Sequence, residues 1–298
     1  MSVLVTENAT KYYGERIGVD GLTLSIDAGT IFGFLGPNGS GKTTTIRMLL
    51  GFLRPTRGKA SLFGLDCWSN SHQVKAEVGY VPGDLRLYPW MTLKNGLDLI
   101  GRIRKREIKS AGYELAEQFA LDPELRVRKM SRGTRQKLGL ILALAHRPKA
   151  LILDEPTSAL DPPMQEAFYQ ILRERANDGG TVFFSSHTLG EIETLCDRVG
   201  ILRAGKLVED EKLEVLRNRA ARIVTLAWNV KAIPSVSDLP AALKLVSKAG
   251  SVWKCALVGD LKPMLAWAST QKLADMTISP PDLDGLFREY YQESDAER

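Results

Sequence analysis

The sequence has few cysteines and no long apolar run. Its three cysteines, Cys67, Cys196 and Cys255, are far apart in the 298 residues and match no metal-ligand or disulfide spacing. A reduced, cytosolic protein is the simplest interpretation. The longest uninterrupted non-polar run covers only residues 138–145, whereas a membrane-spanning helix needs about 20 such residues. We therefore expect that nothing crosses a membrane and that any membrane role comes through a partner.

The sequence also shows no targeting signal and no repeats. The N-terminus has neither the basic run nor the apolar core of a signal peptide, and no short repeat or low-complexity tract is evident. The net charge is +5, from 40 basic and 35 acidic residues, which is small for this length. We therefore expect no nucleic-acid partner, although a basic patch facing anionic lipid headgroups is compatible with this charge. With 44% apolar residues the chain can bury a sizeable core, as one large domain or two smaller ones.

A phosphate-binding pattern, G-x-x-x-x-G-K-[ST], stands at residues 36–43. Its glycines allow successive backbone N–H groups to turn inward and form a nest for phosphate oxygens. Lys42 is placed to reach the β- and γ-phosphates, and the hydroxyl of Thr43 is placed to ligate Mg²⁺. The predicted nucleotide-binding residues of this stretch are Gly36, Pro37, Asn38, Gly39, Ser40, Gly41, Lys42, Thr43 and Thr44.

The flanks of the pattern support this interpretation. Residues 30–35 are β-branched and aromatic and predict a strand, whereas residues 44–50 carry apolar side chains at helical spacing. A helix that begins near Lys42 would aim its positive end at the same anion. The alternative is a glycine-rich turn that binds nothing, and the strand before it and the helix after it argue against that.

Two further predicted strands end in candidate metal-binding or catalytic residues. Residues 151–155 form an apolar strand that ends in Asp154 and Glu155. Ligands collect at the C-terminal ends of buried parallel strands, so we expect Asp154 near Mg²⁺ and Glu155 near a water that attacks the γ-phosphate. The next strand, 183–186, ends at His187, which we expect to contact the γ-phosphate and that water. The alternatives are two solvated acids in a turn and a structural histidine.

A second anion site is predicted before the apolar helix that begins near Leu138. In the run 130–138, Ser131 is a plausible helix N-cap, which would be a purely structural role. The same geometry, a helix N-terminus with a hydroxyl and a glycine N–H, can also bind an anion.

The order of elements predicts an α/β fold. Strands are expected at 3–10, 22–26, 60–64, 77–81, 150–153, 181–184 and 198–202, with a turn at 11–14. A helical segment at about 85–145 interrupts them, and strand–helix alternation indicates a mostly parallel, buried sheet. A smaller α+β domain is expected at 216–298, with strands at 222–228, 252–258 and 274–278 and helices at 239–245, 261–271 and 280–291. It has no catalytic constellation, which favours a docking or regulatory module.

These motifs together resemble the nucleotide-binding subunit of an ATP-binding cassette (ABC) transporter, over residues 3–215. Residues 36–43 match the family's phosphate loop, and 130–134 match its signature, Leu-Ser-Gly-Gly-Gln. The metal-binding strand, the D-loop and the switch histidine match residues 151–155, residues 158–161 and His187. Tyr13 matches the aromatic residue that stacks on adenine, with Tyr12 the less favoured candidate.

The resemblance implies an ABC ATPase domain over 1–215. Its P-loop NTPase core would have a mixed, mostly parallel sheet, an N-terminal antiparallel β-subdomain and the inserted helical subdomain. Its cofactors would be ATP and Mg²⁺, with Thr43 and Asp154 at the metal. Glu155, Lys42 and His187 would be catalytic. A second ABC ATPase subunit, expected to be an identical copy, would pair head-to-tail. The signature (Ser131, Arg132, Gly133 and Thr134) and Asp161 of the D-loop would then act on the partner's ATP.

The resemblance also implies a place in the cell. The dimer would drive a separately encoded integral membrane permease and would sit in the cytoplasm on the inner face of the membrane. The ending at 283–291 resembles the tail of many exporter subunits, which suggests export. The stretch 88–91 carries aromatic side chains that belong either to the core or to a groove for a short permease helix.

Two departures from the family pattern leave alternatives open. Gly83 and Asp84 stand where the family has Gln, and a glycine side chain cannot ligate Mg²⁺. Arg132 and Thr134 replace the usual Gly and Gln of the signature. The second hypothesis is therefore a hydrolysis-poor regulatory subunit of a heterodimer. The third is a soluble ABC ATPase acting on DNA or ribosomes, although the chain has neither long coiled coils nor two cassettes in tandem.

Overall fold

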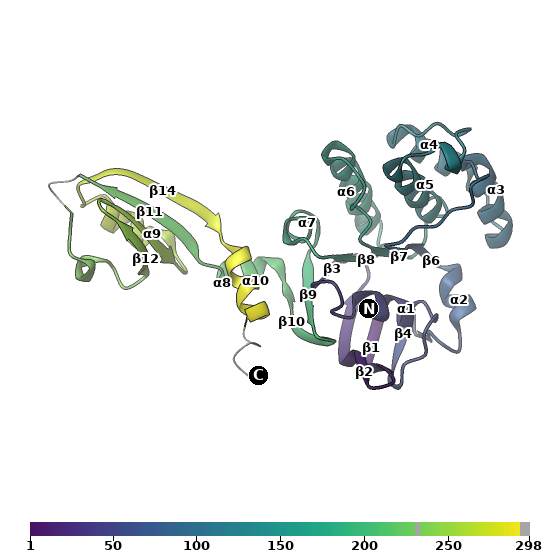
Figure 1. The fold of residues 1–298 in the computed structure, drawn as a ribbon, viewed down its shortest axis with the longest axis horizontal. Coiled ribbons are helices and arrows are strands. Elements are labelled where there is room, and N and C mark those ends of the chain that lie inside the picture. Colours follow the sequence, from purple (N-terminus) through teal and green to yellow (C-terminus); the bar gives the residue numbers. More distant parts are fainter. Residues whose placement is uncertain (230–232, 293–298) are drawn as a thin grey trace. The chain divides into compact units, whose positions relative to one another are not determined.

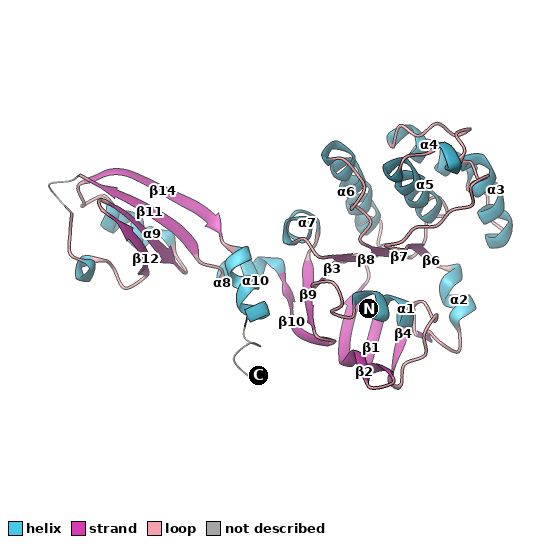
Figure 2. Cartoon of the chain, in the orientation of Figure 1, coloured by secondary structure: helices cyan, strands magenta, loops and turns pink. Residues whose placement is uncertain are grey.

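A computed structural model describes residues 1–229 and 233–292. The chain forms two compact units, Met1–Asp210 and the residues from Glu211 on, whereas the sequence predicts a boundary between 215 and 216. Figure 2 shows that helices and strands alternate through the larger unit and that an antiparallel sheet dominates the smaller one.

An antiparallel sheet opens the first unit. Its strands, in the order β2-β1-β4-β5, are β1 (Ser2–Tyr13), β2 (Arg16–Asp27), β4 (Arg57–Leu62) and β5 (Leu65–Asp66). The predicted turn at 11–14 is wrong, because Tyr12 and Tyr13 still pair with β2. The chain reverses at Gly14, whose φ of 61° suits a residue without a Cβ.

A second sheet forms the centre of the same unit. Its strands, in the order β10-β9-β3-β8-β7-β6, are β3 (Ile31–Leu35), β6 (Val78–Val81), β7 (Ala150–Asp154), β8 (Thr181–Ser186), β9 (Arg198–Arg203) and β10 (Lys206–Lys212). The pairs β9-β3, β3-β8, β8-β7 and β7-β6 are parallel. Every residue of β3, β7 and β8 is buried, as expected for a sheet covered on both faces. The C-terminal ends of these three strands therefore meet at one edge.

Helices cover this sheet on both sides. In Figure 1, α1 lies on the side of the antiparallel sheet, and α6 and α7 lie on the opposite side. The helices of this unit are α1 (Lys42–Leu49), α2 (Ser71–Ala76), α3 (Leu93–Arg104), α4 (Lys109–Gln118), α5 (Arg132–Leu144), α6 (Pro162–Asn177) and α7 (Leu189–Leu195), with a 3₁₀ turn at Val127–Lys129. The run from α3 to α5 is the helical segment that the sequence predicted, which confirms this part of the fold.

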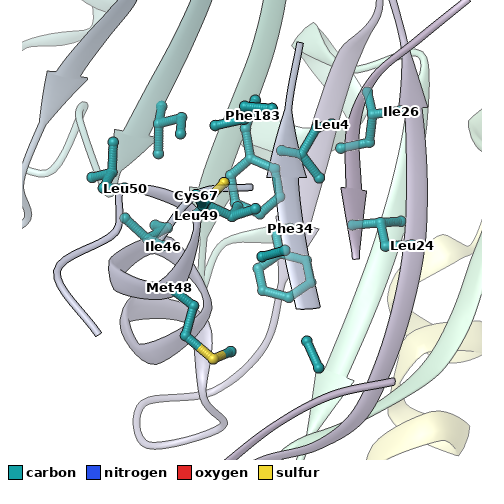
Figure 3. Close-up of a cluster of buried hydrophobic side chains, with 14 of the residues drawn as sticks. Leu4, Leu24, Ile26, Phe34, Ile46, Met48, Leu49, Leu50, Cys67 and Phe183 are labelled. Atoms are coloured by element: carbon teal, nitrogen blue, oxygen red, sulfur yellow. The ribbon is translucent and has the colours of Figure 1, made fainter. Parts of the chain in front are cut away.

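A hydrophobic core holds α1 between the two sheets. Figure 3 shows Ile46 and Leu49 of α1 packed among Phe34, Phe183 and Leu4. The rings of Phe34 and Phe183 have centroids 5.0 Å apart. Burying a large side chain stabilises the fold by about 1.5–3 kcal/mol. This core therefore fixes the start of α1 relative to the strand ends.

The second unit is an antiparallel sheet with helices. It contains α8 (Leu213–Arg219), β11 (Arg222–Trp228), a 3₁₀ turn (Val236–Asp238), β12 (Leu243–Ala249), β13 (Val252–Leu257), α9 (Leu261–Ala268), β14 (Leu273–Pro281) and α10 (Leu283–Gln292). The strand order is β12-β13-β11-β14. Met264 of α9 is buried with Trp228 and Trp253, whose rings cross at 5.5 Å. This unit thus has a core of its own.

The helix predicted at 239–245 is wrong. Residues from Leu243 on form β12, in which Leu243 pairs with Leu257 and Leu245 pairs with Cys255. A helix of about two turns is marginal by itself. Pairing with β13 instead buries Leu243 and leaves Lys244 exposed, so tertiary packing outweighs local preference.

His146, at the end of the helical segment, is a buried titratable group. Its side chain is 4% exposed, and burial lowers its pKa from 6.5 to about 4, with the Arg104 guanidinium adding to the effect. The imidazole therefore stays neutral in the folded chain over a pH range where the unfolded chain binds a proton.

We predict that His146 contributes to a loss of stability when the solution is acidified. Because the unfolded state binds more protons below about pH 6.5, the free energy of unfolding falls as the pH drops towards 4. Replacing His146→Leu should reduce that fall, measured by urea unfolding at about pH 7 and pH 5. The exposed His72→Leu is the control. An identical pH dependence in both variants would contradict the prediction.

Candidate functional site

The predicted phosphate loop connects β3 to α1. A Cβ on Gly36 would lie 2.4 Å from the Leu202 carbonyl oxygen, and one on Gly41 would lie 2.5 Å from the Gly18 carbonyl oxygen. Gly41 also has a φ of 113° and directly precedes α1. Among the described residues, no side chain caps this helix and no acid stands in its first turn. The N-terminus of α1 therefore remains available to an anion.

The loop borders a cavity of about 1010 Å³. Of the predicted nucleotide-binding residues, the cavity is lined by Tyr13, Pro37, Asn38, Gly39, Gly41, Lys42, Thr43 and Thr44. Gly36 and Ser40 are buried. The cavity wall also contains Asp154, Glu155 and His187, so the three strand ends that the sequence singled out share one space.

Asp154 is held by two hydroxyls. Its Oδ2 accepts a hydrogen bond from Thr43 Oγ1 at 3.0 Å, and its Oδ1 accepts one from Ser185 Oγ at 2.6 Å. The carboxylate is 4% exposed, and its strand position is opposite Ser185 in the β7–β8 register. A carboxylate beside a hydroxyl is the donor set that Mg²⁺ prefers when phosphates and water complete its shell. The described residues contain no cluster of three or more His, Cys, Asp or Glu side chains that could hold a metal alone.

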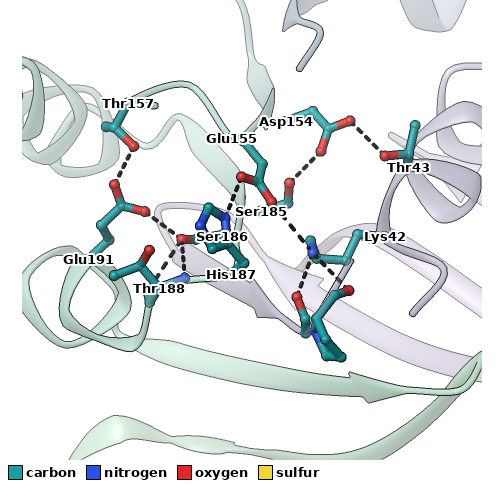
Figure 4. A network of polar contacts seen from close by, with 12 residues as sticks. Lys42, Thr43, Asp154, Glu155, Thr157, Ser185, Ser186, His187, Thr188 and Glu191 are labelled. Atoms are coloured by element: carbon teal, nitrogen blue, oxygen red, sulfur yellow. Dashed lines mark hydrogen bonds and ion pairs between the residues drawn. The ribbon is translucent and has the colours of Figure 1, made fainter. Parts of the chain in front are cut away.

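Glu155 contacts both other predicted catalytic side chains, as Figure 4 shows. Its Oε1 lies 3.5 Å from Lys42 Nζ, and its Oε2 lies 2.5 Å from His187 Nδ1. Lys42 Nζ also donates to the carbonyl oxygens of Gly36 and Pro37. The Lys42 side chain is 6% exposed and lies against its own loop and the Glu155 carboxylate. Glu155 has a left-handed φ of 49°, and its partners differ from those of Asp154.

Sequence reasoning missed Glu191. This α7 residue accepts hydrogen bonds from Thr157 and Ser186, and Ser186 Oγ in turn accepts from Thr188 N at 2.9 Å (Figure 4). It therefore ties the loop after Glu155 to the strand end before His187. The only sequence signal is its place in the first turn of a helix that follows a candidate residue, which is too common to single it out.

The aromatic end of the cavity contains Tyr13. The ring is 44% exposed, and its hydroxyl lies 3.5 Å from Thr44 Oγ1. Two arginines that sequence reasoning did not select, Arg16 and Arg47, line the same cavity, as does Tyr80. Burial and the nearby Asp154 carboxylate raise the pKa of Tyr80 to about 12.

The predicted signature begins α5. Ser131 is its N-cap and accepts a hydrogen bond from Thr134 N at 3.1 Å. A Cβ on Gly133 would lie 2.7 Å from the Ala159 carbonyl oxygen, which brings the signature against the D-loop of the same chain. Of the signature side chains, Arg132 lines the cavity described above. Asp161 caps α6, accepting from Met164 N at 3.0 Å.

At position 83 the structure has room for a Cβ atom. A Cβ on Gly83 would lie 3.5 Å from the Asp154 carbonyl oxygen and 3.6 Å from its Oδ2, which are ordinary contact distances. The neighbouring Asp84 is bound by Arg86 at 2.7 Å, and both side chains are exposed.

A second, apolar cavity of about 370 Å³ lies beside the helical segment. It is lined by residues including Phe52, Tyr80, Leu85, Leu87, Met91 and Leu99. Tyr88 and Trp90 are exposed and stack at 5.5 Å, whereas Met91 is 5% exposed. The stretch 88–91 is therefore divided, with Met91 in the core and two aromatic side chains on the surface.

Comparisons with known proteins agree with this geometry. Residues 19–158 match the family model described as ABC transporter. The chain is 39% identical over 224 residues to the bacitracin transport ATP-binding protein BcrA of Bacillus licheniformis, covering 73% of this chain and 72% of that protein. It is 37% identical over 218 residues to the Nod factor export ATP-binding protein I of Ralstonia nicotianae, covering 70% and 67%.

Solved structures agree as well. An ATP-binding subunit of an ABC transporter has a TM-score of 0.69 and 26% identity, covering 72% of this chain and 92% of its own. A dimeric cassette bound to ADP and Pi has a TM-score of 0.62 and 25% identity, covering 70% and 98%. None of the helices in the described residues has the length and apolarity to cross a membrane. The chain belongs to the ABC transporter family, as an ATP-binding ATPase subunit.

Proposed function

We propose that Glu155 is the residue that polarises the attacking water and that Lys42 and His187 assist it. The observation that carries this proposal is the contact of one carboxylate with both side chains, at the edge of the cavity that the phosphate loop borders. A carboxylate at this place can orient a water for in-line attack. The phosphates would lie against the loop N–H groups and the start of α1.

Lys42 is proposed to exchange partners when ATP binds. Its ammonium now donates to two loop carbonyls and faces Glu155. Phosphate oxygens carry negative charge and form stronger hydrogen bonds with an ammonium than carbonyl oxygens do. The triphosphate would therefore draw Lys42 away and leave Glu155 available to water.

Thr43 and Asp154 are proposed to hold Mg²⁺. Bound there, the ion would supply positive charge for the β- and γ-phosphates. Ser185 keeps the Asp154 carboxylate in place through its 2.6 Å hydrogen bond. Tyr13, whose half-exposed ring borders the cavity, would stack on the adenine.

The active form is proposed to be a head-to-tail homodimer. The dimeric cassettes among the solved relatives support this. Ser131, Gly133 and Thr134 at the start of α5, with Asp161, would face the nucleotide of the partner. The smaller unit, 216–298 by the sequence boundary, would serve docking or regulation.

The dimer is proposed to drive a separately encoded permease for export, on the cytoplasmic face of the membrane. Relatives named for bacitracin transport and Nod factor export support this direction. The apolar cavity and the exposed pair Tyr88 and Trp90 suit a short amphipathic helix of the permease. A hydrolysis-poor regulatory subunit is the second candidate, and Gly83 is the observation that favours it.

We predict that two substitutions both reduce turnover but differ in their effect on ATP binding. Lys42→Ala should weaken ATP binding and abolish turnover, because it removes the cation that meets the phosphates. Glu155→Gln should keep ATP binding but lower turnover by roughly 10²–10⁴-fold, as expected on loss of a general base. Phosphate release and equilibrium binding of ATP distinguish the two variants.

The same Glu155→Gln variant should trap a dimer with Mg-ATP, measured by light scattering. The wild-type chain with ADP is the control. A monomer under both conditions would count against the sandwich dimer, and a wild-type turnover no higher than that of the variant would favour the regulatory candidate.

Restoring the amide at position 83 should change the metal dependence. A Cβ at position 83 lies at ordinary contact distance from Asp154, and the amide of Gly83→Gln would offer Mg²⁺ one more oxygen. We expect activity to saturate at lower Mg²⁺ than in the wild type, read from a Mg²⁺ titration of ATPase activity. Gly83→Ala controls for added bulk. Superimposable titrations of the Gln and Ala variants would show that the amide does not matter.

Docking can be tested by co-purification with the permease. Trp90→Ala removes an exposed ring of the proposed contact and should lower the yield of the complex. Tyr113→Ala, an exposed aromatic residue on α4, is the matched control. Equal recovery of the permease with both variants would argue against docking at Trp90.

A further inference from the structure

Glu191, in the first turn of α7, connects two segments of the proposed site (Figure 4). One oxygen of its carboxylate accepts a hydrogen bond from Thr157 Oγ1, and the other accepts one from Ser186 Oγ. Thr157 is 2% exposed and Ser186 is 1% exposed. Hydrogen bonds to a charged acceptor are stronger than those between neutral groups. The carboxylate therefore bridges the loop after β7 and the end of β8.

The packing of α7 on the central sheet holds this bridge in place. Ile192 and Leu195 of the helix are buried. A Cβ on Gly33 of β3 would lie 2.8 Å from Ile192 Cδ1 and 3.0 Å from Cys196 Sγ, so the helix approaches the strand as closely as only a glycine permits. Because Glu191 directly precedes Ile192, its side chain starts from a fixed backbone.

The two ends of the bridge adjoin the proposed catalytic pair. Thr157 follows Glu155 by two residues, and Ser186 directly precedes His187. Ser186 Oγ also accepts a hydrogen bond from Thr188 N at 2.9 Å, which closes the backbone around the histidine. The His187 side chain is 53% exposed, so few neighbouring side chains restrain it. Its place, 2.5 Å from Glu155 Oε2, therefore depends on where its backbone is held.

We propose that Glu191 is a positioning residue for ATP hydrolysis, which keeps His187 beside Glu155 by tying the two strand ends together. This inference rests on the roles proposed above for Glu155 and His187. Glu191 does not line the nucleotide cavity, so it would act through its neighbours. Without the bridge, two buried hydroxyls would lose their acceptor and the end of β8 would be free to move. A displacement of about 1 Å in a catalytic site can cost about 100-fold in rate.

The alternative is that Glu191 only stabilises α7. An acid in the first turn of a helix interacts favourably with the positive end of the helix dipole, and no side chain caps α7. Glu214 has the same place in α8, which is also seven residues long and has no side-chain cap. Glu214→Ala is therefore a matched control for the loss of such an acid.

Steady-state kinetics of the full chain test the bridge. Glu191→Ala should lower kcat for ATP hydrolysis by about 10- to 100-fold and change KM by less than about twofold, because the phosphate loop is untouched. Glu191→Gln should recover most of kcat, since an amide offers one acceptor and one donor group and a hydroxyl can pair with either. Glu214→Ala should leave both constants unchanged. A loss that appears only in KM, or a Gln variant as slow as the Ala variant, would contradict the proposal.

A double-mutant cycle tests whether Glu191 acts through His187. In the His187→Ala background, Glu191→Ala should lower the residual kcat by less than about twofold, because the side chain that it positions is gone. Thr157→Val removes one end of the bridge at nearly constant volume and should show the same non-additivity, which covers the case that Glu191→Ala does not fold. An undiminished loss in the His187→Ala background would overturn the proposal.

NMR distinguishes failure of this inference from failure of the proposed function. Labelled imidazole carbons report the surroundings of the three histidines without any turnover, and His187→Ala identifies the signal of His187. In the nucleotide-free chain, Glu191→Ala should shift that signal, whereas the signals of His72 and His146 stay in place. If the wild-type chain hydrolyses no ATP, the proposed function fails, but the shift still decides the role of Glu191. An unmoved His187 signal would overturn the inference.

Discussion

The parallel register of β3, β8 and β7 is the constraint on which the site depends. Asp154 lies opposite Ser185, and Leu35 lies opposite Ser186. Strands that are distant in the chain therefore end at the same edge of the sheet. Burial of all three strands and the aromatic contact between Phe34 and Phe183 hold that register. A slip by one residue would turn each strand-end side chain to the other face of the sheet and separate the acid pair from the loop.

The sequence was sufficient for the parts of the site that are local. The glycines, Lys42 and Thr43 stand in one short run with a strand before it and a helix after it, and the structure has both. The family and its ATPase activity, inferred from ordered motifs, are confirmed by the comparisons. The roles of the individual site residues stay predictions.

The contacts and elements that the sequence does not predict depend on packing between distant segments. Glu191 matters because α7 turns it towards Thr157 and Ser186, and no local pattern marks that contact. The residues from Leu243 on carry apolar side chains that fit a helix or a strand, and pairing with β13 decides between them. In the sequence, Arg132 is only a substitution in a motif. The cavity that it borders can be recognised only from the fold.

The backbone conformation at position 155 restricts which residues can stand there. With a φ of 49°, this position disfavours side chains branched at Cβ, whereas asparagine and aspartate adopt such angles more readily than most. The proposed catalytic acid therefore stands in a backbone conformation that residues other than glycine adopt infrequently. Strain of this kind persists only where neighbouring contacts impose it, and Glu155 has such contacts with Lys42 and His187.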